Sequence, residues 1–469
     1  MQGRQLWIEL DRSKLAVPLV QQVYDQLRRA ILQGKLRAGE RLPSTRTLAS
    51  ELRMARSSLV EIYEQLLIEG YVVSTPGSGT YVAHGISCPS EQETIFEEQE
   101  PQAVEEQDVI DFRPGVPALA EFPRRIWSRL ATQVFAELPA SMLGYDQPAG
   151  RDELRQVLAR YLLRWRGVRC QPAQIIITTG AAQALVLVAQ LLLSLTKTLL
   201  IEDPAHHEIQ QIFTSTGLTL LPIPIDEAGI QTSHLPAPTP GASAFITPSH
   251  QFPLGGTLPV QRRQQLLQFV RASGGYIIED DYDSEMRYSG AVVSSVQGLG
   301  PERVIYIGTF SKILAPSLRI GYVILPPPLL ETARNLKRFM DMHSPSFDQL
   351  ILASFISEGH LDRHVLKMRR LYRRRRDALL NSLKTCFPHH LQISGAATGL
   401  NLLASFEDIT FNADLLAAIE AAGVRVYPVE TYAIRKRLHL HELIMGYANL
   451  SEARIVEGIH RLQAVLTQA

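Results

Sequence analysis

The sequence is poor in cysteine, with only three in 469 residues: Cys88, Cys170 and Cys386. They are too far apart to form a CxxC motif or a set of zinc ligands, so we expect neither a disulfide framework nor a metal site. The first residues, MQGRQLWIELDRSK, lack the apolar segment of a secretion signal. Together with reduced thiols, this predicts a cytoplasmic protein.

Long hydrophobic runs and an excess of charge are also missing. The longest apolar run, ALVLVAQLLLSL at 184–195, is too short to cross a bilayer. Lys and Arg (47) balance Asp and Glu (47), so net charge indicates neither a nucleic acid nor a membrane partner. Locally, residues 1–82 contain eleven basic and eight acidic side chains, whereas residues 83–108 contain eight acidic and no basic ones. Only the first segment can contact a polyanion.

The residue pattern divides the chain into three zones. Residues 1–82 form a compact, patterned zone, and residues 83–108 are rich in Glu and Gln, which is typical of a flexible acidic linker. From 109 to 469, short β-branched segments such as QIIITTG, SAFITPS and RVIYIGTF alternate with amphipathic helices. That alternation predicts an α/β domain with a doubly wound, mostly parallel sheet.

The first zone has the pattern of a winged helix-turn-helix. Apolar residues at helical spacing predict a helix over 18–34 that ends at a glycine. RLPSTRTLASEL (41–52) predicts a second helix with Ser44 as its N-cap, and a third helix follows over 56–70. YVVSTPGSGTYV (71–82) then predicts two short strands around a glycine-rich tip.

Short hydrogen-bond donors and arginines gather where such a fold meets DNA. Arg56, Ser57 and Ser58 begin the third helix, and in DNA readers the start of that helix reaches base edges and phosphates. Arg46 lies on the preceding helix, and Gly77 in the wing tip allows the main chain to approach a phosphate closely. The alternative is a small solvated helical domain that contains several arginines.

The run LPSTRTLASEL…ARSSLVEIYEQLLIEGYVVSTPGSGTYV resembles the GntR winged-helix signature almost from end to end. Ala55 stands where relatives often carry a hydroxyl side chain, so one phosphate contact is expected to be missing. The resemblance implies that double-stranded DNA is contacted by Arg46, Arg56, Ser57, Ser58 and Gly77.

A second set of residues that could bind a ligand or take part in a reaction begins at TFSKILAPSLRIGY (309–322). Lys312, directly after an apolar strand, offers an amine for a Schiff base, and a nearby cation or burial lowers the pKa of such an amine. Arg319 can serve both as that cation and as a phosphate clamp, with hydroxyl donors from Thr309 and Ser311. Pyridoxal 5'-phosphate (PLP) needs an amine and a phosphate cradle of this kind.

Residues at the ends of other strands could make the remaining contacts that PLP needs. In TTGAAQAL (178–185), the amides of Ala181 and Ala182 open a helix whose dipole favours an anion. Asp280 can keep the pyridine nitrogen protonated. Three more side chains are expected to hydrogen-bond the phenolic oxygen of the ring or to stack on the ring: Tyr282, Gln251 and His206. Taken singly, each residue has an ordinary explanation, such as a helix start, a cap or a solvated lysine.

The order and spacing of these residues resemble a fold-type I aminotransferase across nearly all of 109–460, including FRPGVPALAEFPRRIW and LGYDQPAG. The resemblance implies a smaller α+β C-terminal domain and a homodimer in which Tyr145 reaches the phosphate of the neighbouring subunit. The two halves in this order look like a MocR-type regulator, the GntR subfamily that carries an aminotransferase-like effector domain.

Four positions depart from that family pattern. His206 replaces an aromatic Tyr or Phe, Leu254 replaces Thr or Ser, and Asn401 replaces a frequent His. Ile444 occupies the position of the arginine that binds a substrate carboxylate, unless the alignment of HELIMGYANL (441–450) is shifted by one or two residues. Three other arginines are alternatives for that role: Arg425, Arg435 and Arg437.

These patterns lead to one functional hypothesis and two alternatives. The hypothesis is a dimeric transcriptional regulator that binds two DNA half-sites and senses a small amine, an amino acid or PLP itself through transimination at Lys312. The first alternative is a working aminotransferase with an accessory DNA-binding domain, and the second is a structural dimeriser that has lost PLP. The basic stretch KMRRLYRRRRDAL (367–379) is interpreted as a solvated face with interdomain ion pairs, or else as a contact with flanking DNA.

Overall fold

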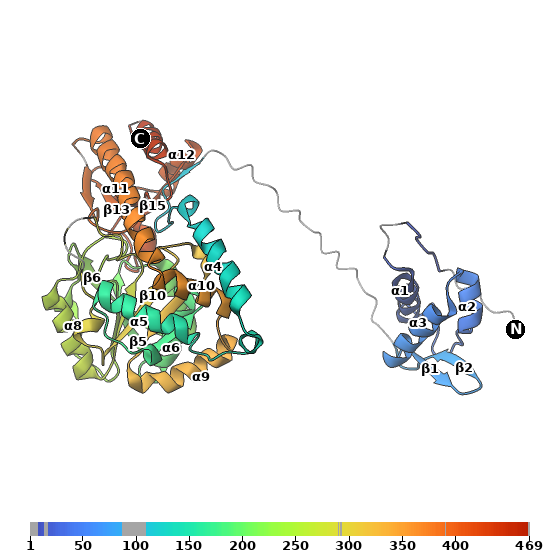
Figure 1. Cartoon of the computed structure of the whole chain (residues 1–469). Helices are drawn as coiled ribbons and strands as arrows, with labels where there is room; N and C mark the ends of the chain where they lie inside the picture. Colours follow the sequence, from blue (N-terminus) through green and yellow to red (C-terminus); the bar gives the residue numbers. More distant parts are fainter. Residues whose placement is uncertain are drawn as a thin grey trace. The chain divides into compact units, whose positions relative to one another are not determined.

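The computed structural model describes residues 8–13, 17–86, 109–288, 290, 293–389 and 391–467. The chain divides into two compact units, one within residues 1–103 and one within 104–469, and each is described by itself (Figure 1). From residue 87 onward, the expected linker lies outside the described residues.

The N-terminal unit has three helices and a two-stranded antiparallel wing. Its elements are α1 (Leu19–Leu32), α2 (Thr45–Leu52), α3 (Arg56–Ile68), β1 (Val72–Thr75) and β2 (Gly79–Val82). Ser44 caps α2 as predicted, because its side-chain oxygen accepts a hydrogen bond from the amide of Thr47 at 3.1 Å. Val23, Leu48 and Leu59 have no exposed surface and join the three helices in one small core. The expected winged helix-turn-helix is confirmed.

A mixed eight-stranded sheet forms the centre of the second unit, in the order β4-β11-β10-β9-β8-β5-β6-β7. All neighbouring strands are parallel except at β11 and β7, which run antiparallel to their neighbours. The strands are β4 (Ile175–Thr178), β5 (Thr198–Asp203), β6 (Thr219–Asp226), β7 (Gly229–Ile230), β8 (Ser243–Ile246), β9 (Ile277–Asp281), β10 (Val304–Thr309) and β11 (Gly321–Ile324). The predicted doubly wound, mostly parallel sheet is therefore confirmed.

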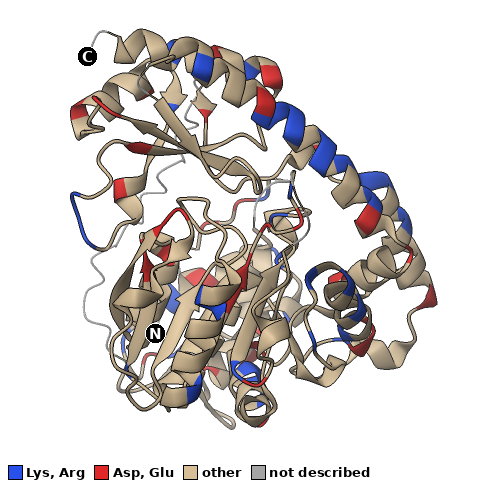
Figure 2. Cartoon of the chain, turned by 90° about the vertical axis from the view of Figure 1, so that its left-hand side faces the viewer, with Lys and Arg blue, Asp and Glu red and all other residues tan. Residues whose placement is uncertain are grey.

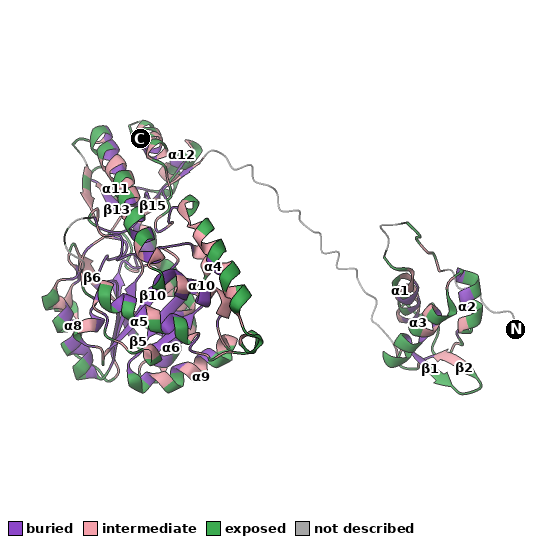
Figure 3. Ribbon diagram, viewed as in Figure 1, coloured by how far each residue is buried: buried purple, intermediate pink, exposed green. Residues whose placement is uncertain are grey.

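Helices cover both faces of this sheet, and its strands, apart from β6, are buried throughout most of their length (Figure 3). Ile176 packs with α6, α7 and α9 on one face, whereas its neighbours Ile175 and Ile177 belong to the core on the other face with α5. This alternation is the period of two that a strand imposes on its side chains. The helices are α4 (Arg124–Glu137), α5 (Asp152–Arg166), α6 (Gly180–Leu193), α7 (His207–Thr216), α8 (Val260–Ser273), α9 (Leu330–Asp341) and α10 (Ser346–Ser357).

A smaller α+β part completes the second unit. Its antiparallel sheet has the order β12-β13-β16-β15, and β3 pairs with β14 in parallel. The elements are β3 (Ile110–Asp111), α11 (His360–Cys386), β12 (Leu391–Ser394), β13 (Asn401–Phe406), α12 (Ala413–Ala421), β14 (Val424–Arg425), β15 (Tyr427–Pro428), β16 (Glu442–Gly446) and α13 (Glu452–Leu466). Short 3-10 turns lie at Leu119–Glu121, Ala140–Leu143, Pro172–Gln174, Thr232–His234, Gln297–Leu299, Pro316–Leu318, Pro327–Leu329 and Val429–Tyr432.

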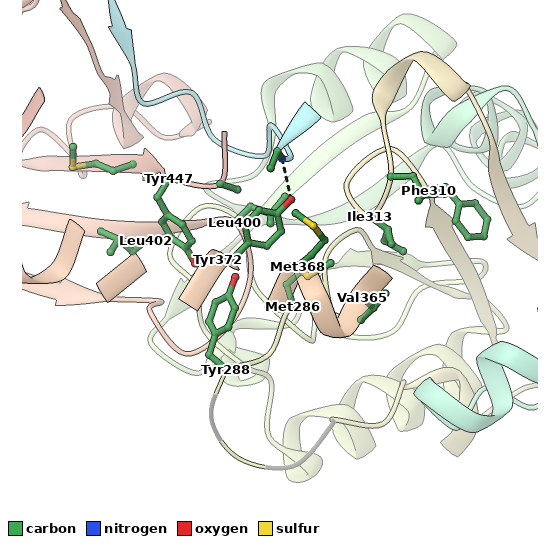
Figure 4. Packing of buried hydrophobic residues seen from close by; sticks show 14 of the residues in the cluster. Met286, Tyr288, Phe310, Ile313, Val365, Met368, Tyr372, Leu400, Leu402 and Tyr447 are labelled. Atoms are coloured by element: carbon green, nitrogen blue, oxygen red, sulfur yellow. Dashed lines mark hydrogen bonds between the residues drawn. The ribbon is translucent and has the colours of Figure 1, made fainter. Parts of the chain in front are cut away.

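One apolar core joins the smaller part to the large sheet. Tyr372 on α11 lies beside Met368 and accepts a hydrogen bond from the amide of Ala118 at 2.9 Å (Figure 4). Leu400 and Tyr447, which come from the ends of the smaller sheet, pack into the same cluster (Figure 4). The long helix α11 therefore connects two sheets that share one interior.

Basic residues recur along α11 (Figure 2). Most of them have partners within this unit. Four guanidinium groups donate to backbone carbonyls: those of Arg369, Arg373, Arg375 and Arg376. Lys367 pairs with Glu121 at 2.7 Å, and Arg374 pairs with Glu452 at 3.3 Å. These contacts agree with the interpretation of residues 367–379 as a solvated face with ion pairs inside the unit, rather than as a contact with DNA. In the described part of the chain, no helix is long and apolar enough to cross a membrane.

Candidate cofactor site and DNA-reading surface

A cavity of about 240 Å³ lies beside the ends of β5, β9 and β10 and the start of α6. Parallel strands place their carboxyl ends at one edge of a sheet, which is where doubly wound folds bind ligands. All the residues predicted for PLP line this cavity except Gln251 and Tyr145: Ala181, Ala182, His206, Asp280, Tyr282, Thr309, Ser311, Lys312 and Arg319.

The amine of Lys312 lies in a partly enclosed position just after β10. Gly115 lies against it, since a Cβ atom at that position would stand 3.0 Å from the lysine Nζ. Burial lowers the pKa of Lys312, although the carboxylates of Asp283 and Glu208 act in the opposite direction. A lowered pKa leaves more of the amine uncharged, which is the form that attacks a carbonyl carbon.

One end of the cavity is built for a phosphate-like anion. Gly180 opens α6 with φ +78°, and a Cβ atom there would stand 2.8 Å from Nη2 of Arg319. Arg319 is held in place because Nη2 donates to the carbonyl of Thr179 at 3.0 Å. The free amides at the start of α6, at Ala181 and Ala182, complete a cradle of cation, helix dipole and N–H donors.

Two hydroxyl groups border the same end of the cavity. The hydroxyl of Thr309 donates to that of Ser311 at 3.1 Å, and the Ser311 amide donates back to Thr309 at 3.2 Å. This short loop therefore presents its side chains as a fixed pair. Hydroxyl groups at this position can add hydrogen bonds to the oxygens of a dianion.

Asp280 is buried, and its Oδ1 atom has no hydrogen-bond partner among the described residues. Burial and the charge of Asp281 raise the pKa of Asp280 to about 7. Buried polar atoms are normally paired, so an unpaired carboxylate oxygen at a cavity wall fits an N–H group of a ligand. A protonated ring nitrogen would satisfy this oxygen.

Tyr282 and His206 also line the cavity. The Tyr282 hydroxyl donates to the carbonyl of His250 at 2.9 Å, and the ring of His250 is itself 2.9 Å from Asp283. The ring of His206 lies 5.1 Å from that of Phe252, and burial lowers the pKa of this histidine. An uncharged imidazole can stack on an aromatic ligand as the more usual Tyr or Phe does.

Gln251 does not line the cavity, although it is buried beside it. Its amide nitrogen donates to the carbonyl of Pro204 at 3.1 Å, and its oxygen accepts from the amide of Leu254 at 3.0 Å. The side chain therefore holds two loops together. Tyr145 does not line the cavity either; it is 87% exposed, and its ring meets that of His343 edge-on.

Ile444 is fully buried on β16, where it packs against Phe252, Val429 and Tyr432. An apolar side chain in a core cannot bind a carboxylate. The alternative arginines are engaged elsewhere: Arg425 pairs with Glu420, and Arg435 pairs with Asp203 at 2.9 Å. Arg437, the third alternative, does not line the described cavity either.

The polar residues of the cavity that were not assigned a role from the sequence include Glu202 and Asn401. Glu202 at the end of β5 is buried, and burial raises its pKa to about 7. Asn401 at the start of β13 is 1% exposed, and neither atom of its amide has a partner among the described residues. A carboxylate in the strand-end sequence IEDP was a usable signal for Glu202. Asn401 comes from the smaller sheet, so only the tertiary fold brings it to the cavity.

The predicted DNA contacts lie together in the N-terminal unit. Arg56 and Ser57 open α3, and both are exposed, whereas Ser58 in the same turn is half-buried. Arg46 on α2 is exposed and, like Arg56, makes no hydrogen bond or ion pair with a described residue. Gly77 occupies the exposed tip of the wing with φ +75°. Ala55, as the N-cap of α3, provides no side-chain hydrogen bond to the helix start.

Comparisons with known proteins match both units. The family model for aminotransferase class I and II matches residues 109–462, and the model for bacterial regulatory proteins of the gntR family matches residues 19–82. The uncharacterized HTH-type transcriptional regulator YdeL of Bacillus subtilis is 34% identical over 452 residues, covering 96% of this chain and 97% of that protein. The probable rhizopine catabolism regulatory protein MocR of Rhizobium meliloti is 34% identical over 479 residues, covering 97% and 95% of the two chains.

Solved aminotransferase structures resemble the second unit. Kynurenine aminotransferase of Pyrococcus horikoshii, solved in complex with PMP, has a TM-score of 0.71 and 26% identity, with 78% of this chain and 92% of that chain covered. LysN of Thermus thermophilus, complexed with N-(5'-phosphopyridoxyl)-L-leucine, has a TM-score of 0.69 and 27% identity, covering 77% and 93%. With two family models matched in this order and full-length relatives of the same design, the chain belongs to the MocR-type regulators of the GntR family, in which a winged helix-turn-helix is followed by an aminotransferase class I and II domain.

Proposed function

We propose that this regulator binds PLP in the cavity at Lys312 and that a small amine, an amino acid or PLP itself is its signal. The observation that carries the proposal is the combination of an anion cradle, an unpaired buried carboxylate and a partly buried lysine around one cavity. When bound, PLP supplies an aldehyde carbon to which an amine can be joined covalently and reversibly.

Different residues of the cavity would bind different parts of PLP. Arg319 and the start of α6 would neutralise the phosphate, while Asp280 would accept a hydrogen bond from the protonated ring nitrogen. Lys312 would supply the amine that ties the group to the protein, and its lowered pKa favours attack. His206 would stack on the ring, and Tyr282 would hydrogen-bond its phenolic oxygen.

The signal would act by replacing Lys312. A free amine bound in the cavity would take the place of Lys312 as the covalent partner of PLP by transimination, which would release the lysine amine and remove the covalent tie between cofactor and protein. Regulation follows only if the ligand then binds one conformation of the protein better than another. In a homodimer, exposed Tyr145 would serve the site of the second copy, and two α3 helices would bind two DNA half-sites.

Absorption spectroscopy of the purified full-length protein tests this function. The wild type should show a visible band of lysine-bound PLP that shifts with one class of amine. Lys312→Ala should lose the band while keeping the far-ultraviolet circular dichroism of the fold. An unchanged, borohydride-reducible band in Lys312→Ala would refute the assignment. Arg56→Ala is the matched variant, which should keep the band and lose binding to the DNA fragments that the wild type selects from a random pool.

Catalytic transamination is the second candidate, favoured by the aminotransferase neighbours of the fold. Half-reactions need only the cofactor groups named above. Repeated turnover of amino acids also needs a carboxylate anchor, and Ile444 is an apolar core residue at the expected place. Steady conversion of an amino acid and a keto acid at catalytic concentrations of protein would establish turnover and remove the pure sensor function.

A further inference from the structure

Asn401 is a polar residue of the cavity that the proposed PLP site leaves without a function. Asn401 is 1% exposed, lines the cavity, and leaves both Nδ2 and Oδ1 without a partner among the described residues. A buried amide with neither donor nor acceptor satisfied is rare in proteins and destabilises them. An unpaired donor and acceptor side by side indicate a ligand that satisfies both.

Asn401 is separate from the groups that would hold PLP. Lys312, Asp280 and the anion cradle all come from the large sheet and its helices, whereas Asn401 begins β13 of the smaller sheet. The amine, ring-nitrogen and phosphate functions of a PLP site already have candidate partners on the large sheet and its helices. Asn401 instead lines the part of the cavity wall that comes from the smaller sheet.

The backbone holds Asn401 firmly in this place. Asn401 is paired with Gly446 in the β13–β16 ladder. On its amino-terminal side, the carbonyl of Leu400 accepts from the amide of Tyr447 at 3.1 Å, and the carbonyl of Gly399 accepts from the Tyr447 hydroxyl at 2.8 Å. A side chain on so fixed a backbone can select a ligand by geometry.

The charges around the cavity disfavour a carboxylate in the same space. Among the described lining residues, Arg319 is the sole guanidinium, and it belongs to the anion cradle. Glu202 and Glu208 also line the cavity, and Ile444 leaves the expected carboxylate anchor apolar. Arg113 lies near enough to lower the pKa of His206 and Lys312, but it is exposed and does not line the cavity.

We propose that Asn401 determines the specificity of the sensor and that its signal is an amine bearing a neutral group that both donates and accepts hydrogen bonds, such as a hydroxyl or a carboxamide. A carboxylate accepts only, so it would leave Oδ1 unpaired, and an alkyl group would leave both atoms unpaired. The inference rests on the proposed PLP function, because the amine of the signal must reach the carbon held by Lys312.

Three matched series of amines test the proposal on the full-length protein loaded with PLP. The series are 2-aminoethanol, 3-amino-1-propanol and 4-amino-1-butanol; glycine, β-alanine and 4-aminobutyrate; and the corresponding propyl-, butyl- and pentylamine. Dissociation constants follow from the shift of the visible band. We expect the best amino alcohol to bind at least about tenfold more tightly than its alkylamine and amino-acid counterparts, since one satisfied buried amide is worth about that factor.

Asn401→Leu keeps the size of the side chain and removes its hydrogen-bonding atoms. This variant should bind all three series within about threefold of one another and keep its visible band. Its melting temperature should stay equal or rise, because an unpaired buried amide is replaced by an apolar group. A structural role for Asn401 would instead lower the melting temperature and leave the preference for amino alcohols intact, and that result would overturn the proposal.

The remaining outcomes separate this proposal from the function on which it rests. If amino acids bind best to the wild type and Arg113→Ala abolishes that binding, the carboxylate anchor is Arg113 and the assignment to Asn401 is wrong. If no amine of any series shifts the band, the amine-sensing function itself fails, and the specificity proposal fails with it.

Discussion

Replacing Asp280 by asparagine should make the PLP-free protein more stable at neutral and alkaline pH while weakening PLP binding. Burial raises the pKa of Asp280 from 3.8 to about 7 in the folded protein. Ionising this carboxylate inside the fold therefore costs free energy that the unfolded chain does not incur. Asparagine has the same shape as the protonated acid and never ionises.

The size of the effect follows from the two pKa values. One pKa unit corresponds to about 1.36 kcal/mol, so the full difference is about 4 kcal/mol once the pH is well above 7. The unfolded chain releases its proton near pH 4, whereas the folded protein keeps it until pH 7. Stability conferred by the neutral acid is thus complete below pH 4 and falls as the pH rises toward 7. Between pH 5 and pH 8, the advantage of Asp280→Asn should grow by roughly 2–3 kcal/mol.

Urea denaturation of the PLP-free protein measures this difference. Two of the three tryptophans, Trp127 and Trp165, lie in the second unit, so tryptophan fluorescence measured in a Trp7→Phe background reports the unfolding of that unit. The free energies of unfolding of wild type and Asp280→Asn are compared at pH 5, 6, 7 and 8. PLP affinity is measured separately from the visible band and should fall because an amide cannot keep the ring nitrogen protonated.

Asp226→Asn is a control whose effect on the free energy of unfolding should have the opposite sign. Hydrogen bonds from Arg262 hold the pKa of Asp226 below its ordinary value, so this carboxylate stabilises the fold once it is ionised. Its contribution is present above the pKa of the unfolded chain and is lost as the pH falls, which makes Asp226→Asn destabilising at neutral pH. An Asp280→Asn variant that loses stability at pH 8, as this control does, would refute the account of Asp280 as a carboxylate without a partner.

Two further substitutions test other parts of the molecule. Gly180→Ala places a Cβ atom on a residue with φ +78° and 2.8 Å from Nη2 of Arg319. It should reduce PLP affinity, measured by titration of the visible band, by at least about tenfold. A variant with wild-type affinity would refute the anion cradle. Ser44→Ala removes the N-cap of α2 and should destabilise the N-terminal unit by about 1 kcal/mol, seen by calorimetry as a shift of one transition; a shift of every transition would mean that the two units do not melt separately.

Local sequence signals predicted the parts of the fold that depend on nearby residues. The alternation of Ile175, Ile176 and Ile177 between two cores follows directly from the geometry of a strand. Ser44 could be predicted as a cap because capping joins residues only three positions apart. The predicted cofactor residues meet around one cavity for a similar reason, since each lies at a strand end or helix start on the same edge of the sheet.

Contacts between distant segments were harder to predict from the sequence. Gln251 looked like a ligand donor in its motif, but its amide is taken by the carbonyl of Pro204, 47 residues away. The reversed direction of β11 is likewise set by its pairing with β10 and β4. Asn401 reaches the cavity from a second sheet, so only tertiary structure showed that its amide has no partner.

The unpaired groups of the cavity connect stability with sensing. Asp280, His206 and Asn401 each carry a buried polar atom without a partner among the described residues, and each such atom costs about 1–3 kcal/mol. A ligand that satisfies these atoms binds the folded protein and not the unfolded chain, so it stabilises the fold by mass action. The atoms lie on both the large and the smaller sheet, at Asp280 and Asn401 respectively. In the proposed function PLP would satisfy the first, which would leave the second for the signal. A signal that contacts both the cofactor and the smaller sheet can therefore favour one arrangement of the smaller sheet relative to the large sheet. That differential binding is what a regulatory switch requires.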